Sequence, residues 1–314
     1  MRRTFAFHSR KDLELLVEEF SHLVQELEYS DQKSVRLFEI LHQLYHALII
    51  PVADQLAALP KEEVITIIPH SQLFLVPFSA LRDEQGVFLI EKYALVYSPA
   101  IAILEYTRQN AAHVIHQDKP NLLAFVNPID NLVSAEQDFD AITRFYATAQ
   151  QNAIYRRQKA SKEVLEQQAS NYTVLCFVTH AQAFDESPLD SYLALAPATS
   201  DDGRLKVPAI FRLELHTDLV ILGACETGRG KITGDGVNGL SRAFLSAGTP
   251  TLLMSLWPVG ENESVDQLYQ FHEFWRDGCT SKAEALRQAQ LEALANHPTQ
   301  PEIWAGFALI GEWN

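Results

Sequence analysis

The chain has 314 residues, of which 47% are hydrophobic and 10% aromatic, so it is long enough to bury a large core. Its formal net charge of −15 argues against nonspecific binding to nucleic acid or to anionic membranes. Three cysteines without paired spacing are typical of a reducing compartment and not of a disulfide framework. No apolar run reaches the roughly 20 residues that span a bilayer, and the N-terminus lacks the apolar stretch of a signal peptide. We therefore predict a soluble, cytoplasmic protein.

The first 60 residues predict helices. Apolar residues recur at helical spacing over 13–27, a polar stretch at 29–34 interrupts them, and the spacing resumes over 35–48. A third short helix is expected over 52–59. We interpret residues 1–60 as an N-terminal helical segment that forms a cap or a platform for another module.

The next region, residues 61–115, predicts short strands and one helix. Candidate strands lie at 64–68, 73–76, 87–89 and 94–97, a turn at 83–86, a helix at about 100–110 and a linker at 111–120. The turn sequence DEQG lies between two of the candidate strands. We therefore expect a small β-hairpin in this region.

From residue 116 to residue 314 strands alternate with helices. Expected strands are 122–126, 153–156, 173–179, 192–195, 219–222, 251–256 and 304–310; expected helices are 138–150, 161–168, 239–247, 262–276 and 281–295. Several of these strands are continuous apolar runs, as in parallel sheets that are buried on both faces. The alternation predicts an α/β fold, with a mostly parallel central sheet between helices on both faces.

Two of the apolar runs are followed by residues with reactive side chains. His180 follows the strand at 173–179, and Cys225 follows the strand at 219–222 at the start of a glycine-rich loop. If the two strands are neighbours, both side chains lie at one edge of the sheet, where α/β proteins place their sites. An imidazole beside a thiol can generate the thiolate nucleophile. The pattern predicts a Cys–His pair, although a lone cysteine is more often a small buried hydrophobe.

The sequence around these strands resembles the CHAT domain, a caspase-like member of the caspase, separase and gingipain group of cysteine peptidases. The resemblance rests on LVILGACETGRG, GDGVNGLSRAFLSAGTPTLLMSLWPV and WAGFALIG, with IIPHSQLFLVPFSAL and FVTHAQ upstream, and covers roughly residues 60–314. His180 matches the histidine of the family's THG motif, and Cys225 matches the cysteine of its ACET motif. The resemblance implies a caspase-like three-layer fold and cysteine endopeptidase activity without a metal or an organic cofactor.

The residue after the histidine departs from the family pattern, because Ala181 stands where glycine is usual. In the related peptidases the backbone N–H of that residue donates to the oxyanion, and alanine keeps this N–H. We therefore expect an oxyanion hole formed by the backbone N–H groups of Ala181 and Cys225. A Cβ would cost free energy if the turn needed positive φ. A catalytically weak or inactive scaffold is thus the alternative interpretation.

Acidic residues flank the two strand ends, namely Asp185, Glu186, Asp190 and Asp235. They are interpreted either as solvated loop charges or as an acidic pocket for Lys or Arg, a preference that several relatives of this fold have. Trp257, at the end of the strand at 251–256, is expected to line the substrate groove, because such walls are commonly apolar.

Several other residues could carry chemistry, but we interpret them as structural or solvent-exposed. His42 and His46 have helical i, i+4 spacing but no matching acidic or cysteine ligand nearby, so they are expected on a solvated or packed face. Cys176 lies inside a buried run, and Cys279 lies in a loop. The loop at 223–230 resembles a phosphate loop, but it has Arg and Gly where Lys and Ser or Thr are needed.

By the resemblance, the expected function is regulated proteolysis of a specific protein partner, in bacterial antiviral defence or programmed cell death. An activating or sensor protein is expected to dock on the N-terminal helices, residues 10–60, because the resemblance does not account for that segment. Four glycines in residues 226–238 give this stretch a high backbone entropy. We therefore expect a latent enzyme in which this stretch becomes ordered when substrate or a partner binds.

Overall fold

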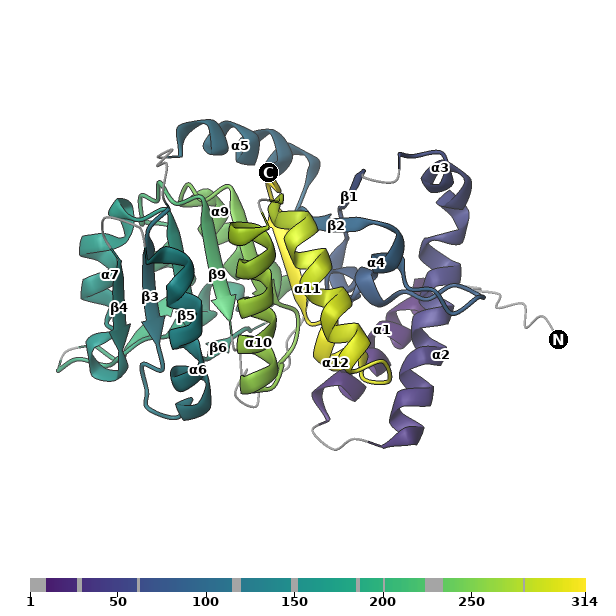
Figure 1. The fold of residues 1–314 in the computed structure, drawn as a ribbon, viewed down its shortest axis with the longest axis horizontal. Coiled ribbons are helices and arrows are strands. Elements are labelled where there is room, and N and C mark those ends of the chain that lie inside the picture. Colours follow the sequence, from purple (N-terminus) through teal and green to yellow (C-terminus); the bar gives the residue numbers. More distant parts are fainter. Residues whose placement is uncertain are drawn as a thin grey trace.

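The computed structural model describes the chain except for residues 1–9, 27–29, 61–62, 115–119, 148–151, 185–186, 200, 224–233 and 279 and the side chains of 234–238. An eight-stranded sheet runs through the molecule in the order β1-β2-β11-β10-β9-β5-β3-β4 (Figure 1). Its strands are β1 (Val64–Ile67), β2 (Ala94–Tyr97), β3 (Leu122–Val126), β4 (Ala153–Arg156), β5 (Val174–Val178), β9 (Leu219–Gly223), β10 (Thr251–Ser255) and β11 (Phe307–Gly311). Neighbouring strands are parallel except β10 and β11, which are antiparallel. The predicted mostly parallel sheet is confirmed.

Three of the longer helices begin at a serine whose side chain caps them. The longer helices are α1 (Arg10–Gln25), α2 (Asp31–Leu48), α5 (Ile101–His113), α6 (Val133–Thr143), α7 (Lys162–Gln168), α9 (Gly234–Ser246), α10 (Glu261–His272) and α11 (Lys282–Asn296). The shorter helices are α3 (Ala53–Ala57), α4 (Leu89–Lys92), α8 (Val207–Ile210) and α12 (Pro301–Trp304). Ser30, Ser161 and Ser281 each accept a backbone N–H with the side-chain oxygen at the start of α2, α7 and α11. No helix in the described part of the chain is long and apolar enough to cross a membrane.

Helices cover the sheet on both faces, so successive residues of each central strand enter different cores. Phe125 and Phe177 stack with ring centroids 5.3 Å apart in the core that also contains side chains of α7 and α9. Cys176 precedes Phe177 in β5 and lies opposite Ile221 of β9. Both side chains enter the opposite core, with side chains of α6, α10 and α11. This arrangement is the predicted three-layer fold.

The N-terminal helices pack on the core instead of standing apart from it. Phe20 of α1 is 1% exposed, and its ring meets Trp257 edge-on with centroids 5.6 Å apart. β2 joins the sheet beside β11 through the pair Tyr97 and Ile310. One sheet therefore continues from the predicted region 61–115 into the predicted region 116–314, and the division into three regions stays a prediction.

Two strands predicted in the hairpin region are wrong. Residues 73–76 fall mostly in the 3-10 helix Ser71–Leu75, whose Phe74 is 1% exposed, and the stretch packs against α1 and α9. At 87–89 only a single bridge from Phe88 to Arg82 remains, because α4 begins at Leu89. A short apolar run reports burial but does not distinguish a strand from another buried segment. The turn at 83–86 is confirmed by the Gly86 N–H bond to the Asp83 carbonyl, at 3.1 Å.

A buried histidine lies in the core beside α6. His272 is 0% exposed, and its Nδ1 donates to the Leu268 carbonyl at 2.6 Å. Its Nε2 has no hydrogen-bond partner among the described residues. The rings of Phe145 and Tyr146 lie 5.9 and 5.7 Å from it. Burial in this aromatic surrounding lowers the pKa of His272 to about 4.

We predict that this histidine makes the fold less stable in mild acid. The folded protein excludes a proton that the unfolded chain binds below about pH 6.5, so stability is present above that pH and decreases as the pH falls toward 4. Between pH 7 and pH 5 the free energy of unfolding should fall by about 2 kcal/mol through His272 alone. Urea titrations at both pH values should show this fall in wild type and its loss in His272→Phe. His22→Ala, on the exposed side of α1, should behave as wild type; an unchanged pH dependence in His272→Phe would contradict the assignment.

Candidate functional site

The carboxyl ends of β5 and β9 lie side by side at one edge of the sheet. The two strands are parallel neighbours, and Val178 is opposite Gly223. The strands that precede His180 and Cys225 are thus neighbours, which is the condition for placing both residues at one edge of the sheet. His180 follows Val178 by two residues, as Cys225 follows Gly223 by two residues in the sequence. Cys225 itself lies outside the described residues.

His180 is held between the large sheet and a small three-stranded antiparallel sheet. The small sheet contains β6 (Ala181–Gln182), β7 (Tyr192–Ala194) and β8 (Arg204–Lys206) in that order. The N–H of Ala194 donates to the His180 carbonyl at 2.9 Å. The hydroxyl of Thr179 donates to the Ala194 carbonyl at 2.5 Å. These two contacts to Ala194 fix the backbone around the histidine against β7.

Ala181 occupies an ordinary strand position. It lies opposite Leu193 in β6 and is absent from the non-glycine residues with positive φ in the described chain. The neighbouring pair, His180 and Ala194, is hydrogen-bonded, and such pairs alternate with pairs that are not. The N–H of Ala181 consequently points away from β7. The condition under which alanine would strain this turn is not met.

A contact that the sequence reasoning missed involves the loop after β3. The Nε2 of His180 lies 2.8 Å from the Oδ1 of Asn131. Asn131 is exposed and lies two residues before α6. The available signal was the Asn-Pro dipeptide that ends β3, which marks a turn at the same sheet edge, but the pairing of β3 with β5 had to be known first.

The conformation of this loop depends on Asn127, which is 0% exposed and has φ of 50°. Its Oδ1 accepts the backbone N–H groups of Asn131 and Leu132, both at 2.8 Å. Its Nδ2 donates to Glu136 at 2.8 Å. Arg157, at the end of β4, adds a 3.1 Å contact to the same carboxylate. One carboxamide thus fixes both the start of α6 and the position of Asn131.

Burial raises the pKa of Glu136, but hydrogen bonds from Asn127 and Arg157 outweigh it and leave that pKa below its usual range. The carboxylate therefore stays ionised near neutral pH. Its stabilising contribution is present above its ordinary pKa and is lost as the pH falls through the lowered value.

Of the other candidate substrate-binding residues, the structure describes the side chains of Asp190 and Trp257. Asp185 and Glu186 lie outside the described residues, as does the side chain of Asp235 in the first turn of α9. Asp190 pairs with Lys206 at 2.9 Å, which reduces its free negative charge. Trp257 is 2% exposed and donates from Nε1 to the Glu302 carbonyl at 2.8 Å. Its side chain belongs to the core beneath α1 and forms no wall of a groove in this conformation.

The other candidates from the sequence that the structure describes make contacts typical of structural residues. His42 contacts the Arg82 carbonyl at 3.1 Å, and His46 lies 3.6 Å from Glu84. Within the described residues, no group of three or more His, Cys, Asp or Glu side chains is placed to hold a metal ion. Cys176 is 0% exposed, and burial raises the pKa of its thiol far above the ordinary value. Cys279 and the residues 224–233 that follow β9 lie outside the described residues.

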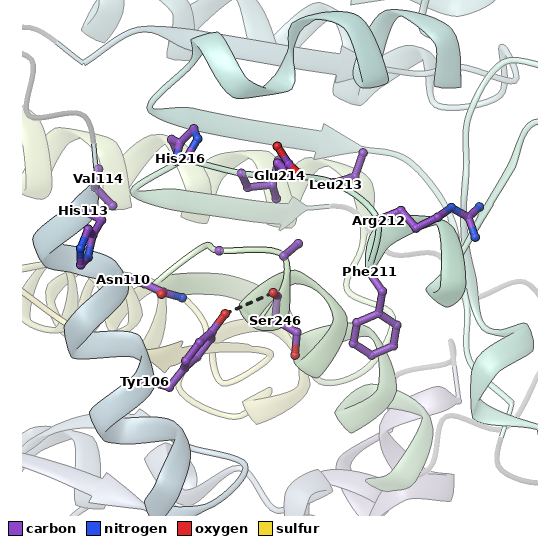
Figure 2. A pocket seen from close by; sticks show the side chains of 13 residues that line it. Tyr106, Asn110, His113, Val114, Phe211, Arg212, Leu213, Glu214, His216 and Ser246 are labelled. Carbon is purple, nitrogen blue, oxygen red and sulfur yellow. Dashed lines mark hydrogen bonds between the residues drawn. The ribbon is translucent and has the colours of Figure 1, made fainter.

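A cavity of about 830 Å³ lies at the opposite, amino edge of the sheet (Figure 2). Tyr106 and Asn110 of α5 line one side, and Glu214 and His216 of the segment before β9 line another. The hydroxyl of Tyr106 donates to the Ser246 carbonyl at the end of α9, at 3.2 Å. None of the predicted site residues lies here, so this cavity is separate from the edge that carries His180.

The fold is a mostly parallel sheet between two helical layers, with a histidine at the carboxyl end of a central strand, an arrangement compatible with a caspase-like peptidase scaffold. The family model described as "CHAT domain" matches residues 39–312, and the chain belongs to this family. The match begins inside α2, earlier than the residue 60 expected from the motifs. It leaves α1 and the first part of α2 outside.

Solved structures of the Saccharomyces cerevisiae separase–securin complex share this fold. One superposes with a TM-score of 0.58 at 14% identity, covering 96% of this chain and 20% of that chain. Another gives a TM-score of 0.56 at 12% identity, covering 97% and 22%. At these identities the likeness concerns the fold alone.

The curated relatives carry the name tetratricopeptide repeat protein 28. The human protein (Homo sapiens) is 38% identical over 105 residues, which is 32% of this chain and 4% of that protein. The mouse protein (Mus musculus) is 36% identical over 102 residues, again 32% and 4%. The chain therefore matches only a small part of the length of these relatives.

We predict that Asn127→Gly destabilises the protein without straining its backbone. Glycine adopts φ of 50° freely, but the variant leaves the N–H groups of Asn131 and Leu132 without their acceptor. The free energy of unfolding should fall by about 1–3 kcal/mol, measured by urea titration. Asp130→Gly is the matched control, because Asp130 also has positive φ but its side chain makes, among the described residues, an exposed ion pair with Arg157 and no buried hydrogen bond. It should cost less than about 1 kcal/mol; equal losses in both variants would contradict the role of the Asn127 side chain.

Proposed function

We propose that this chain is a cysteine endopeptidase whose dyad consists of Cys225 and His180. The observation that carries the proposal is the register of β5 and β9, which sets Val178 opposite Gly223. Both candidate residues follow these partners at the same offset in the sequence. Two peptide units span at most about 7 Å, and neighbouring strands lie about 4.8 Å apart. The covalent chain therefore limits how far residue 225 can be from the carboxyl end of β5.

The proposed reaction follows from these groups. The thiol of Cys225 transfers its proton to His180, and the sulfur attacks the carbonyl carbon of the scissile bond. The N–H groups of Ala181 and Cys225 donate to the oxyanion, and the outward direction of the Ala181 N–H supports this role. His180 then protonates the leaving amine. Water, deprotonated by the same imidazole, releases the acyl group and restores the thiol.

The proposed substrate is a specific protein, cut in regulated proteolysis within the cytoplasm during bacterial antiviral defence or programmed cell death. We propose that an activating or sensor protein docks on the N-terminal helices. Their inner faces are occupied by the core, but Leu15 of α1 and Val35 of α2 are 53% and 59% exposed. The family match leaves α1 outside, which is compatible with a function particular to this chain.

A second candidate function is a peptidase-like scaffold without activity. The curated relatives are named for tetratricopeptide repeats and match only in part, which is compatible with a role in binding. The two functions differ in the thiol. An active dyad makes Cys225 react rapidly with a peptidyl electrophile at neutral pH and makes this reaction depend on His180.

We predict that Cys225→Ala and His180→Ala each abolish proteolysis while the protein remains folded. Candidate substrates would be incubated with wild type and both variants, and new termini identified by mass spectrometry. Cys279→Ala is the matched control and should cut as wild type. Retained cleavage in either folded variant would exclude the dyad. In the scaffold function, wild-type Cys225 would be no more reactive than Cys279.

We also predict a basic residue before the scissile bond. The reason is the acidic character of Asp185, Glu186 and Asp235, which belong to segments adjoining the two strand ends. A peptide library cleaved at moderate salt would show enrichment of Lys or Arg. Enrichment of apolar residues would contradict this and would point to Phe184 and Leu189, which are 41% and 61% exposed on either side of residues 185–186.

A further inference from the structure

We propose that Asn131 is a positioning residue for His180: its side-chain oxygen fixes the imidazole as the tautomer with the proton on Nε2, which makes Nδ1 the nitrogen that exchanges a proton with the nucleophile. The catalytic part of this inference rests on the proposed function. The contact between the two side chains, 2.8 Å from Nε2 to Oδ1, is independent of it. The resemblance to the family had suggested a dyad alone.

The tautomer follows from the chemistry of the two groups. An amide oxygen only accepts hydrogen bonds, so the imidazole nitrogen facing it must carry a proton. A neutral imidazole has a single N–H, and Nδ1 therefore holds the lone pair. With the proton on Nδ1 instead, the lone pair of Nε2 would face the oxygen of Asn131. The contact thus orients the ring and selects its basic nitrogen at once.

With this assignment every proton transferred during the reaction is accounted for. Transfer from the thiol to Nδ1 yields thiolate and an imidazolium with both N–H groups, and the hydrogen bond from Nε2 to Asn131 persists. Transfer from Nδ1 to the leaving amine restores the neutral ring in the same tautomer. Unlike a carboxylate, the neutral amide of Asn131 is a poor proton acceptor. Its part is orientation throughout, and it exchanges no proton.

The position of Asn131 is set by its backbone. Its side chain is exposed, so packing does not hold it. The Oδ1 of Asn127 instead accepts the N–H groups of Asn131 and of the next residue, and Asn127 N–H itself bonds to the Val178 carbonyl of β5 at 2.9 Å. The same short segment therefore joins the strand that carries His180 to the residue that contacts its ring.

Strained backbone is concentrated around this contact. Asn127, Asp130 and Arg157 are three of the four non-glycine residues with positive φ in the described chain. Arg157 lies 3.3 Å from Asp130 and 3.1 Å from Glu136, which in turn accepts from Asn127. Such conformations persist where surrounding contacts over-determine them, and they cluster at functional sites. Residues that follow β3, β4 and β5 are thus linked by contacts that fix the orientation of the His180 imidazole.

The test compares full-length wild type with Asn131→Ala, Asn131→Asp and the control Asn296→Ala, an exposed asparagine at the end of α11. Nitrogen-15 NMR of histidine-labelled protein, with the His180 signals assigned through His180→Gln, reports the tautomer. The alkylation rate of Cys225 by a peptidyl electrophile across pH 5 to 9 reports the base. Melting temperatures of all variants show whether the fold is kept.

We expect the Nε2–H tautomer in wild type, in Asn131→Asp and in Asn296→Ala, and a mixture of tautomers in Asn131→Ala. Alkylation at neutral pH should fall by about ten- to a hundredfold in Asn131→Ala and recover in Asn131→Asp, with melting temperatures unchanged. An Nδ1–H tautomer in wild type, or an unchanged tautomer in Asn131→Ala, overturns the proposal. If wild-type Cys225 is unreactive while the tautomer still depends on Asn131, the peptidase function fails and the positioning contact stands.

Discussion

The pairing of β5 with β9 is the constraint on which the candidate site depends. Both strands are buried on both faces, with every residue of each strand buried. Phe177 and Leu222 enter one core, whereas Cys176 and Ile221 enter the other. A slip by one residue would exchange these side chains between two differently shaped cores. Packing therefore sets the register of the two strands. The register in turn places the carboxyl ends of β5 and β9 opposite each other, so that the segments after them begin side by side.

The site edge is stabilised by polar contacts where the apolar cores end. Asn127, Glu136 and Arg157 form one connected network with Asn131 and His180. Removal of Asn127 alone would affect both the start of α6 and the orientation of the imidazole. Stability and site geometry are coupled here, because the same carboxamide bonds to the backbone and to Glu136. The network also requires an ionised Glu136, which its lowered pKa maintains at neutral pH.

Much of the fold was predictable because its strands are continuous apolar runs and several of its helices have serine caps. β3, β5, β9 and β10 coincide within a residue or two with the predicted ranges. Residues 73–76 were not predictable from hydrophobicity, since burial against α1 and α9 gives the same signal as burial in a sheet. Trp257 was misjudged for a related reason. Its place at a strand end indicated a groove, whereas α1 covers it through Phe20, a contact between residues far apart in the chain.

The site was predictable to the extent that it depends on strand ends. His180 follows an apolar strand directly, so its place at the sheet edge could be inferred from the chain itself. Asn131 could not, because it reaches His180 only through the pairing of β3 with β5 and through a loop with positive φ at Asn127 and Asp130. Neither the pairing nor those dihedral angles leave a distinct pattern in the sequence.

The alanine after the histidine was the main argument from sequence for an inactive scaffold, and its force depended on backbone strain. Ala181 lies in β6 without positive φ, and its N–H points away from β7. A Cβ is compatible with such a position, as in any strand. The substitution therefore does not by itself separate a peptidase from a scaffold. What separates them is whether the thiol of Cys225 is activated by an imidazole whose basic nitrogen is fixed from the opposite side of the ring.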